Sequence, residues 1–167
     1  NLHSGPDFLR NRIWDAEVSE TENGTKITFS LFSPDGDQNY PGNADIRVSY
    51  TLTNADELRI DYHMTCDEDT IANFTNHAYF NLAGQATGSA MHQKVWIDAD
   101  QFTIADQYSI PTGELVPVKG TPMDFTTLKY IDQDIEADYE PLKFAGGYDH
   151  NWVLHHKEGE LALCAKA

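Results

Sequence analysis

Two runs of alternating apolar residues constrain the fold of this chain more than any other feature. In Asp45–Leu52 and again in Leu58–Met64, every second residue is apolar. An alternation of period two is typical of a strand with one face on a core and the other in water. The residues between the runs, Asn54-Ala55-Asp56-Glu57, are of types that form turns. The two runs are therefore predicted to pair as an antiparallel hairpin.

Further strands are indicated by the same alternation or by short apolar runs between turn residues. They are predicted at Ala16–Val18, Lys26–Leu31, Val95–Ile97, Trp152–Leu154 and Leu161–Ala165. Asn23-Gly24 supplies the turn between the first two. No stretch of more than two helical turns carries the apolar stripe of a helix. The predicted fold class is all-β, an antiparallel β-sandwich, with residues 1–167 belonging to a single domain.

The net charge of the chain limits which classes of molecule it is expected to bind. The chain has 11 Lys+Arg against 27 Asp+Glu, a formal net charge of −16. Such a field repels nucleic-acid phosphates and anionic membrane surfaces, so neither is an expected partner. No apolar run approaches the roughly 20 residues that cross a bilayer. The two cysteines, Cys66 and Cys164, form no disulfide framework, which makes the cytoplasm the default expectation.

The segment around His77 has the chemistry of a sugar site. Residues 73–82 combine amide, hydroxyl and aromatic side chains with this histidine. Amides and hydroxyls bond sugar hydroxyls, and aromatic faces cover the C–H surface of a sugar. Histidine is also the side chain whose ordinary pKa, about 6.5, suits proton transfer near neutral pH. The competing interpretation is a core histidine bonded to a backbone carbonyl.

Two further segments are candidates for binding. His3 lies in a loop-like start, and Asp149 follows the glycine pair of Gly146-Gly147-Tyr148-Asp149-His150-Asn151, which could equally form a plain turn. No metal is expected, because His155 and His156 are adjacent and would point to opposite faces of a strand. No nucleotide cofactor is expected either, because the chain has no glycine-rich phosphate loop.

Taken together, five stretches in this order resemble the aldose 1-epimerase (galactose mutarotase) family. They are Leu2-His3-Ser4-Gly5 with Arg12-Ile13-Trp14 following, Ser33-Pro34-Asp35-Gly36 with Tyr40-Pro41-Gly42-Asn43 behind it, Thr75-Asn76-His77-Ala78-Tyr79-Phe80-Asn81-Leu82-Ala83-Gly84, Ile110-Pro111-Thr112-Gly113-Glu114, and Gly146-Gly147-Tyr148-Asp149-His150-Asn151. The ordered set covers nearly the whole chain and is specific. This resemblance, and not the periodicity, carries the functional prediction.

The resemblance implies a large antiparallel β-sandwich, the mutarotase-like supersandwich, with a sugar site on a concave face. It implies the interconversion of the α and β anomers of free hexoses such as galactose and glucose, without a cofactor. By position in the motifs, His77 matches the general acid and Tyr79 a substrate-contacting residue. His3 matches a histidine that bonds the sugar, and Asp149 an aspartate that holds sugar hydroxyls. Ser4 departs from the family pattern, which usually has glycine there.

The resemblance also implies that residues 1–167 are the central part of a domain truncated at both ends. The family's catalytic base is a Glu expected beyond Ala167, with a sugar-binding Arg expected before Asn1 and a binding Gln after Ala167. The chain by itself is therefore expected to be inactive.

Two alternatives stay open at this point. One is a non-catalytic sugar-binding protein of the same fold. The other is a relative acting on a phosphorylated hexose, which would need an Arg or Lys cluster that this sequence lacks. The preferred hexose and the oligomeric state are not determined by the sequence.

Overall fold

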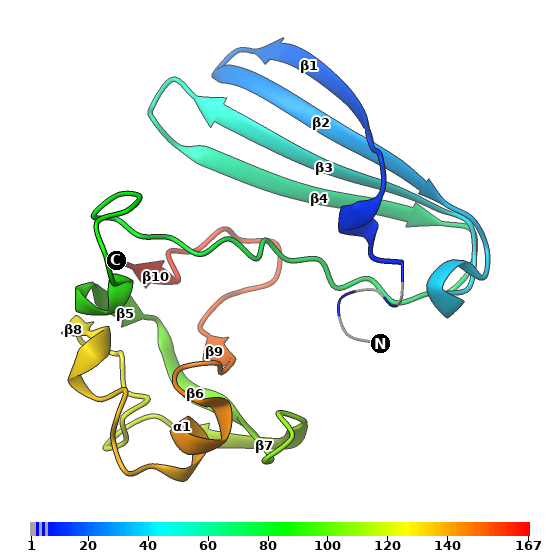
Figure 1. The fold of residues 1–167 in the computed structure, drawn as a ribbon. Helices are drawn as coiled ribbons and strands as arrows, with labels where there is room; N and C mark the ends of the chain where they lie inside the picture. Colours follow the sequence, from blue (N-terminus) through cyan, green and yellow to red (C-terminus); the bar gives the residue numbers. More distant parts are fainter. Residues whose placement is uncertain (1–2, 4, 6) are drawn as a thin grey trace. The chain divides into compact units, whose positions relative to one another are not determined.

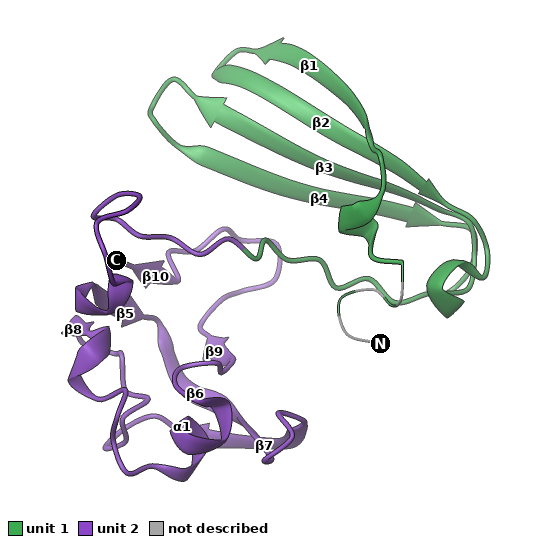
Figure 2. Cartoon of the chain, viewed as in Figure 1, with its two compact units in different colours: residues 1–77 green, residues 78–167 purple. Residues whose placement is uncertain are grey.

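The computed structural model describes residues 3, 5 and 7–167, and the chain forms two compact units (Figures 1 and 2). Unit 1 is Asn1–His77 and unit 2 is Ala78–Ala167. Each unit is built from antiparallel strands, so the predicted all-β class is confirmed. That all 167 residues belong to a single domain stays a prediction.

Unit 1 contains one four-stranded sheet in the order β1-β2-β3-β4, with every neighbouring pair antiparallel. Its strands are β1 (Asp15–Thr21), β2 (Gly24–Ser33), β3 (Ala44–Thr53) and β4 (Leu58–Cys66). Short 3-10 turns lie at Leu9–Asn11 and Asp37–Asn39. The register aligns apolar residues in rows across the sheet, one of them Val18, Ile27, Tyr50 and Ile60. The alternation in the sequence is therefore the alternation of the two sheet faces.

Both predicted turns of this sheet are confirmed. The turn between β3 and β4 is closed by Thr53, whose N–H donates to the Glu57 carbonyl at 2.9 Å and whose hydroxyl accepts from the Glu57 N–H at 3.2 Å. At the turn between β1 and β2, Gly24 has φ 148° and lies against the backbone of β3. A Cβ there would stand 2.1 Å from the Leu52 carbonyl oxygen, so the close approach of β2 to β3 requires a glycine.

Unit 2 contains two three-stranded sheets, in the orders β10-β5-β8 and β7-β6-β9. Their strands are β5 (Lys94–Ile97), β6 (Ala99–Ala105), β7 (Pro111–Pro117), β8 (Lys129–Tyr130), β9 (Trp152–Leu154) and β10 (Ala165–Lys166). Two 3-10 turns, Ala90–His92 and Ile131–Gln133, and one helix, α1 (Glu140–Ala145), complete the unit.

The buried core of unit 2 joins segments that are far apart in the sequence. Phe102 on β6 and Met123 in an irregular segment are 0% exposed, and Val118 and Leu142 pack with them. Two polar side-chain groups at the edge of this cluster donate to backbone carbonyls of the segment that contains Met123. The Trp152 Nε1–H donates to the Met123 carbonyl at 3.1 Å, and the Tyr148 hydroxyl donates to the Pro122 carbonyl at 2.9 Å. Burial raises the pKa of Tyr148 to about 12.

One prediction about local structure is wrong, and one short helix was not predicted. The strand expected at Leu161–Ala165 is present only at Ala165–Lys166, because β5 ends at Ile97 and provides ladder partners for those two residues alone. Alternation does not make a strand where no neighbouring strand pairs with it. The helix α1 was not predicted, since six residues are too few to show a helical period. Its signals are the proline in its first turn and Gly146 at its end, with φ 69°.

Cys66 and Cys164 are both free thiols. Within the part of the chain that the structure describes, no helix is long and apolar enough to cross a membrane.

Candidate functional site

In unit 1 the structure brings two of the predicted site residues together. His77 ends the unit in a segment, residues 69–81, that follows β4 without regular secondary structure. Its ring meets the ring of His3 edge to face, with ring centroids 5.3 Å apart and an interplanar angle of 78°. Both residues are exposed, so both imidazoles are accessible from solvent. The competing interpretation of His77 as a buried core histidine does not fit this placement.

His3 has an unusual backbone conformation. Its φ is 54°, in the left-handed region that residues other than glycine rarely occupy. Such strain persists only where surrounding contacts hold it, and it is common at functional sites. Leu2 and Ser4, which belong to the same predicted motif, lie outside the described residues.

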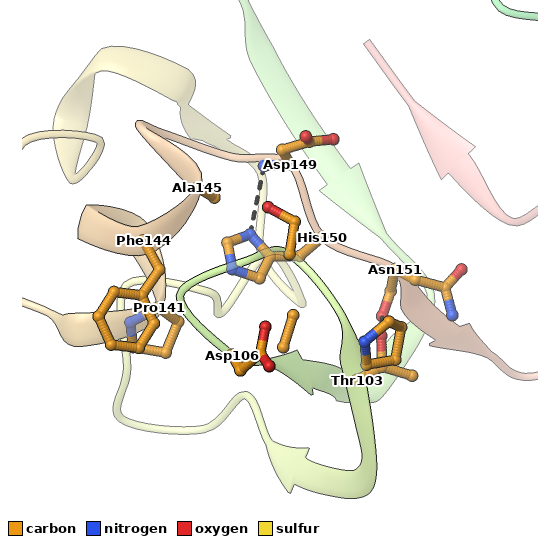
Figure 3. Close-up of a pocket in the computed structure, with 11 residues that line it drawn as sticks. Thr103, Asp106, Pro141, Phe144, Ala145, Asp149, His150 and Asn151 are labelled. Atoms are coloured by element: carbon orange, nitrogen blue, oxygen red, sulfur yellow. Dashed lines mark hydrogen bonds between the residues drawn. The ribbon is translucent and has the colours of Figure 1, made fainter. Parts of the chain in front are cut away.

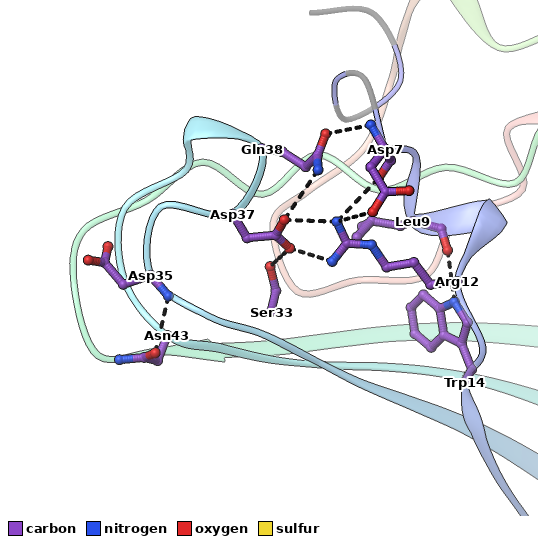
Figure 4. Close-up of polar contacts among 9 residues, drawn as sticks. All are labelled: Asp7, Leu9, Arg12, Trp14, Ser33, Asp35, Asp37, Gln38 and Asn43. Atoms are coloured by element: carbon purple, nitrogen blue, oxygen red, sulfur yellow. Dashed lines mark hydrogen bonds and ion pairs between the residues drawn. The ribbon is translucent and has the colours of Figure 1, made fainter.

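The chain that leads from His3 into β1 is attached to the loop between β2 and β3 by an ion pair (Figure 4). Arg12 donates from Nη1 to Oδ2 of Asp37 at 2.5 Å and from Nη2 to Oδ1 at 2.8 Å. The Ser33 hydroxyl donates to the same carboxylate at 2.6 Å. Both charged side chains are mostly buried, and the guanidinium holds the pKa of Asp37 far below its usual value.

Asp7 connects the ion pair to the start of the chain. The Asp7 carboxylate lies 3.1 Å from Nη2 of Arg12, and the Asp7 backbone N–H donates to Oε1 of Gln38 at 2.9 Å. The Trp14 Nε1–H bonds the Leu9 carbonyl at 2.9 Å, which closes the bend before β1. The segment between His3 and β1 is thus held at several points within unit 1.

In unit 2, Asp149 lies beside a pocket (Figure 3). The pocket is lined by residues of β6, the turn after it, the start of β7, α1 and the segment after α1: Thr103, Ala105, Asp106, Ser109, Pro111, Pro141, Phe144, Ala145, Asp149, His150 and Asn151. Two glycines of positive φ, Gly146 at 69° and Gly147 at 135°, turn the chain from the end of α1 toward this position. The glycine pair thus forms a turn before Asp149, and a binding role for Asp149 stays a prediction.

The residues around Asp149 are attached to β6 and to one another. The Asn151 carbonyl accepts from the Thr103 N–H at 2.9 Å, and the Asp149 N–H donates to Nδ1 of His150 at 3.2 Å. Burial lowers the pKa of His150. Across the pocket, Oδ1 of Asp106 accepts from the N–H groups of Tyr108 and Ile110 at 2.9 and 3.0 Å, so its side chain shapes the turn between β6 and β7.

The sequence of this chain matches those of known proteins. The family model described as aldose 1-epimerase matches residues 2–166. The chain belongs to the aldose 1-epimerase family. It is 39% identical over 156 residues to aldose 1-epimerase of Haemophilus influenzae, a match that covers 92% of this chain and 44% of that protein. It is 36% identical over 166 residues to galactose mutarotase of Sus scrofa, covering 99% of this chain and 45% of that protein.

The fold is similar to that of solved family members. The crystal structure of galactose 1-epimerase from Lactobacillus acidophilus NCFM matches with a TM-score of 0.87 at 28% identity, over 99% of this chain and 47% of that one. An aldose epimerase homologue from C. elegans matches with a TM-score of 0.74 at 29% identity, over 98% and 47%. The chain spans about half the length of the epimerases it matches.

The predicted epimerase site residues are placed as follows. His3 and His77 are in contact within unit 1, whereas Tyr79 and Asp149 belong to unit 2. Tyr79 is 91% exposed. Asn81, in the same motif, holds a turn, because its Oδ1 accepts from the Ala83 N–H at 3.1 Å. Among the described residues, no group of three His, Cys, Asp or Glu side chains is placed to hold a metal ion.

Three residues that hold the segments next to His3 and Asp149 were missed by the reasoning from sequence. Arg12 lies in one of the quoted stretches and Asp37 directly after another, but their pairing spans 25 residues and no local pattern indicates it. His150 was named only as part of the motif around Asp149 and was given no role. Its adjacency to Asp149 was the available signal, since neighbouring residues in an irregular segment often bond each other.

Proposed function

We propose that the full-length protein is an aldose 1-epimerase that interconverts the α and β anomers of a free aldohexose such as galactose or glucose. The observation that carries the proposal is the exposed ring pair of His3 and His77 on two motifs of the family. In the proposal His77 is the general acid. A cofactor is not required, because the reaction moves only protons and one carbon–oxygen bond.

The chemistry needs an acid and a base acting together. His77 gives a proton to the ring oxygen while a base takes the proton of the C1 hydroxyl, and the bond between C1 and the ring oxygen breaks. The open-chain aldehyde then rotates about C1–C2. In the reverse steps the ring oxygen attacks the other face of the aldehyde and returns its proton to His77, and the base reprotonates O1. Each correctly placed acid or base contributes about 10²–10⁴-fold.

Three residues are proposed to bind the sugar. His3, next to His77, bonds a sugar hydroxyl, and the Asp149 carboxylate accepts from others. The Tyr79 ring, 91% exposed, offers an aromatic face to the sugar's C–H surface. A neutral sugar suits a chain of net charge −16, which would repel a phosphorylated hexose.

The catalytic base belongs to the same proposal. A Glu beyond Ala167 fills this role, so residues 1–167 alone are proposed to be inactive. The proposal includes a cytoplasmic location and neither nucleic acid nor membrane as a partner.

Polarimetry tests the proposal directly. Freshly dissolved α-D-galactose is followed with the full-length protein, with His77→Ala and with His63→Ala, an exposed histidine of β4 that serves as the control. The wild type and the control are expected to equilibrate the anomers well above the buffer rate, and His77→Ala about 10²–10⁴-fold more slowly.

Each other outcome corrects a different part of the proposal. Full activity in His77→Ala would assign the acid to another group. A wild-type rate equal to that of buffer, with galactose, glucose and other aldoses, would reject the enzyme and favour the non-catalytic sugar-binding protein.

A further inference from the structure

The ring of His150 is half-buried between β6 and α1. It meets the buried ring of Phe102 edge to face with centroids 5.6 Å apart, and it lines the pocket together with Pro141 and Phe144 of α1. The residue is therefore placed by the core of unit 2, although Asp149 next to it is exposed. Figure 3 shows the Asp149 carboxylate turned away from the His150 ring.

One hydrogen bond of the His150 ring determines its tautomer. The Asp149 backbone N–H can only donate, so Nδ1, at 3.2 Å, must accept with its lone pair. A charged imidazole carries a proton on both nitrogens and has no lone pair to offer. This bond therefore exists only in the neutral ring protonated on Nε2.

The surroundings favour that neutral ring. The acidic residues near it are Asp149 of its own segment, whose carboxylate is turned away from the ring, and Asp106 of the turn between β6 and β7. The residues that α1 contributes to the pocket, Pro141, Phe144 and Ala145, are uncharged. Burial is the largest influence on the ring and disfavours its charged form.

Backbone hydrogen bonds also hold the chain before and after Asp149. The Asn151 carbonyl accepts from the Thr103 N–H of β6 at 2.9 Å, and Gly147 N–H bonds the Leu142 carbonyl of α1 at 2.9 Å. His150 supplies the bond to the Asp149 N–H itself, between these two attachments. An exposed carboxylate on such a segment has a defined position because its backbone is fixed, not because its own oxygens are paired.

We infer that His150 is a positioning residue, whose neutral, Nε2-protonated ring fixes the backbone of Asp149 and thereby the carboxylate that holds the sugar. The inference rests on the proposed function, because it gives Asp149 its sugar-binding role. The His150 ring itself does not take part in proton transfer.

Two amide substitutions of His150 in the full-length protein separate a positioning role from a packing role. In His150→Asn the amide oxygen stands near the place of Nδ1 and keeps an acceptor for the Asp149 N–H. In His150→Gln the amide reaches the place of Nε2, so the Asp149 N–H loses its acceptor. KM and kcat are measured for α-D-galactose mutarotation. His150→Gln is expected to raise KM about three- to tenfold, the effect of one lost hydrogen bond, with kcat within about threefold. His150→Asn is expected to stay within about twofold of the wild-type KM.

Matched substitutions at the exposed His156, to Asn and to Gln, are the control and are expected to leave both constants unchanged. Equal KM increases in His150→Asn and His150→Gln would overturn the inference and leave a packing role only. Unchanged KM in both would overturn it as well. A wild type without activity would instead reject the proposed function.

The tautomer is checked without any activity measurement. Nitrogen-15 NMR of the histidine rings at neutral pH is expected to show His150 with an unprotonated Nδ1 and a protonated Nε2. A protonated Nδ1 would overturn the inference even in an active enzyme.

Discussion

Unit 1 is built on four long strands, whereas unit 2 contains the largest fully buried side chains and joins its shorter elements by irregular segments. The strands of unit 1 contain 7 to 10 residues, and two strands of unit 2, β8 and β10, contain two. Among the described residues, the largest fully buried side chains, Phe102, Met123 and Val118, all belong to unit 2. Regular secondary structure and core burial are thus concentrated in different parts of this chain.

The difference follows from which contacts are local. Each strand of the unit 1 sheet pairs with its neighbour in the sequence, so short turns bring its partners together. In unit 2, β6 pairs with β9 about 50 residues later, and Phe102 packs on Leu142 of α1. Contacts of this kind depend on side-chain packing between distant segments. The two units should therefore respond to different substitutions.

The largest effect is expected from the core of unit 2. Phe102→Ala removes a fully buried ring and should lower the free energy of unfolding by about 3–5 kcal/mol. Denaturant titration of the full-length protein measures the loss, and hydrogen exchange locates it. Exchange is expected to rise in β6, β7 and β9 more than in β1–β4. Phe102→Leu, which keeps most of the apolar volume, should cost less than about 1.5 kcal/mol. An exchange increase of the same size in β1–β4 would break the distinction between the units.

The next effect concerns the polar attachment in unit 1. Arg12→Met leaves the mostly buried Asp37 carboxylate without its cation and should cost about 2–3 kcal/mol, the value of bonds between charged groups. Arg59→Met is the control. Arg59 pairs with Asp61 at 2.8 Å on the exposed surface of β4, and its loss should leave stability unchanged.

Acid titration checks the same pair. The folded pKa of Asp37 is lowered, so its stabilisation is complete above the ordinary carboxylate pKa of about 4 and is lost as the pH falls below it. Asp37→Asn should remove that part of the acid sensitivity. An unaltered acid transition in Asp37→Asn would show that the pair adds nothing to stability.

The smallest effect is expected from two histidines at opposite ends of β9. Nδ1 of His155 bonds Oδ1 of Asp98 at 3.1 Å, and Nε2 of His155 lies 3.2 Å from Oδ2 of Asp100. The hydrogen bond to Asp98 raises the pKa of His155, whereas burial lowers the pKa of His150. NMR titration should therefore find His155 above and His150 below the ordinary histidine pKa of about 6.5.

The two shifts act on stability with opposite sign. The contribution of His155 is complete below the ordinary pKa and is lost as the pH rises through its raised value. The contribution of His150 is complete above the ordinary pKa and is lost as the pH falls toward its lowered value. The two histidines should therefore lower the stability of unit 2 on both sides of the ordinary histidine pKa, in contrast to the one-sided acid sensitivity that Asp37 gives unit 1. Equal pKa values for the two histidines would contradict this.

The sequence by itself determined the sheet of unit 1, because both of its determinants are local. Alternation in Asp45–Leu52 and Leu58–Met64 assigns side chains to faces, and Asn23-Gly24 and Asn54–Glu57 make the turns that join neighbouring strands. The motifs that carry His3, His77 and Asp149 are short stretches as well. Because each motif is local, the amino-acid sequence alone is enough to identify the family and, with it, these candidates.

Only the tertiary structure decided which residues support those candidates. Arg12 finds Asp37 across 25 residues, and Phe102 and Pro141 meet the ring of His150 from separate elements. The strand at Leu161–Ala165 failed for the same reason, since a strand needs a partner and β5 reaches only its last residues. A hydrogen bond or a buried contact depends on two positions at once, and only folding brings distant positions together.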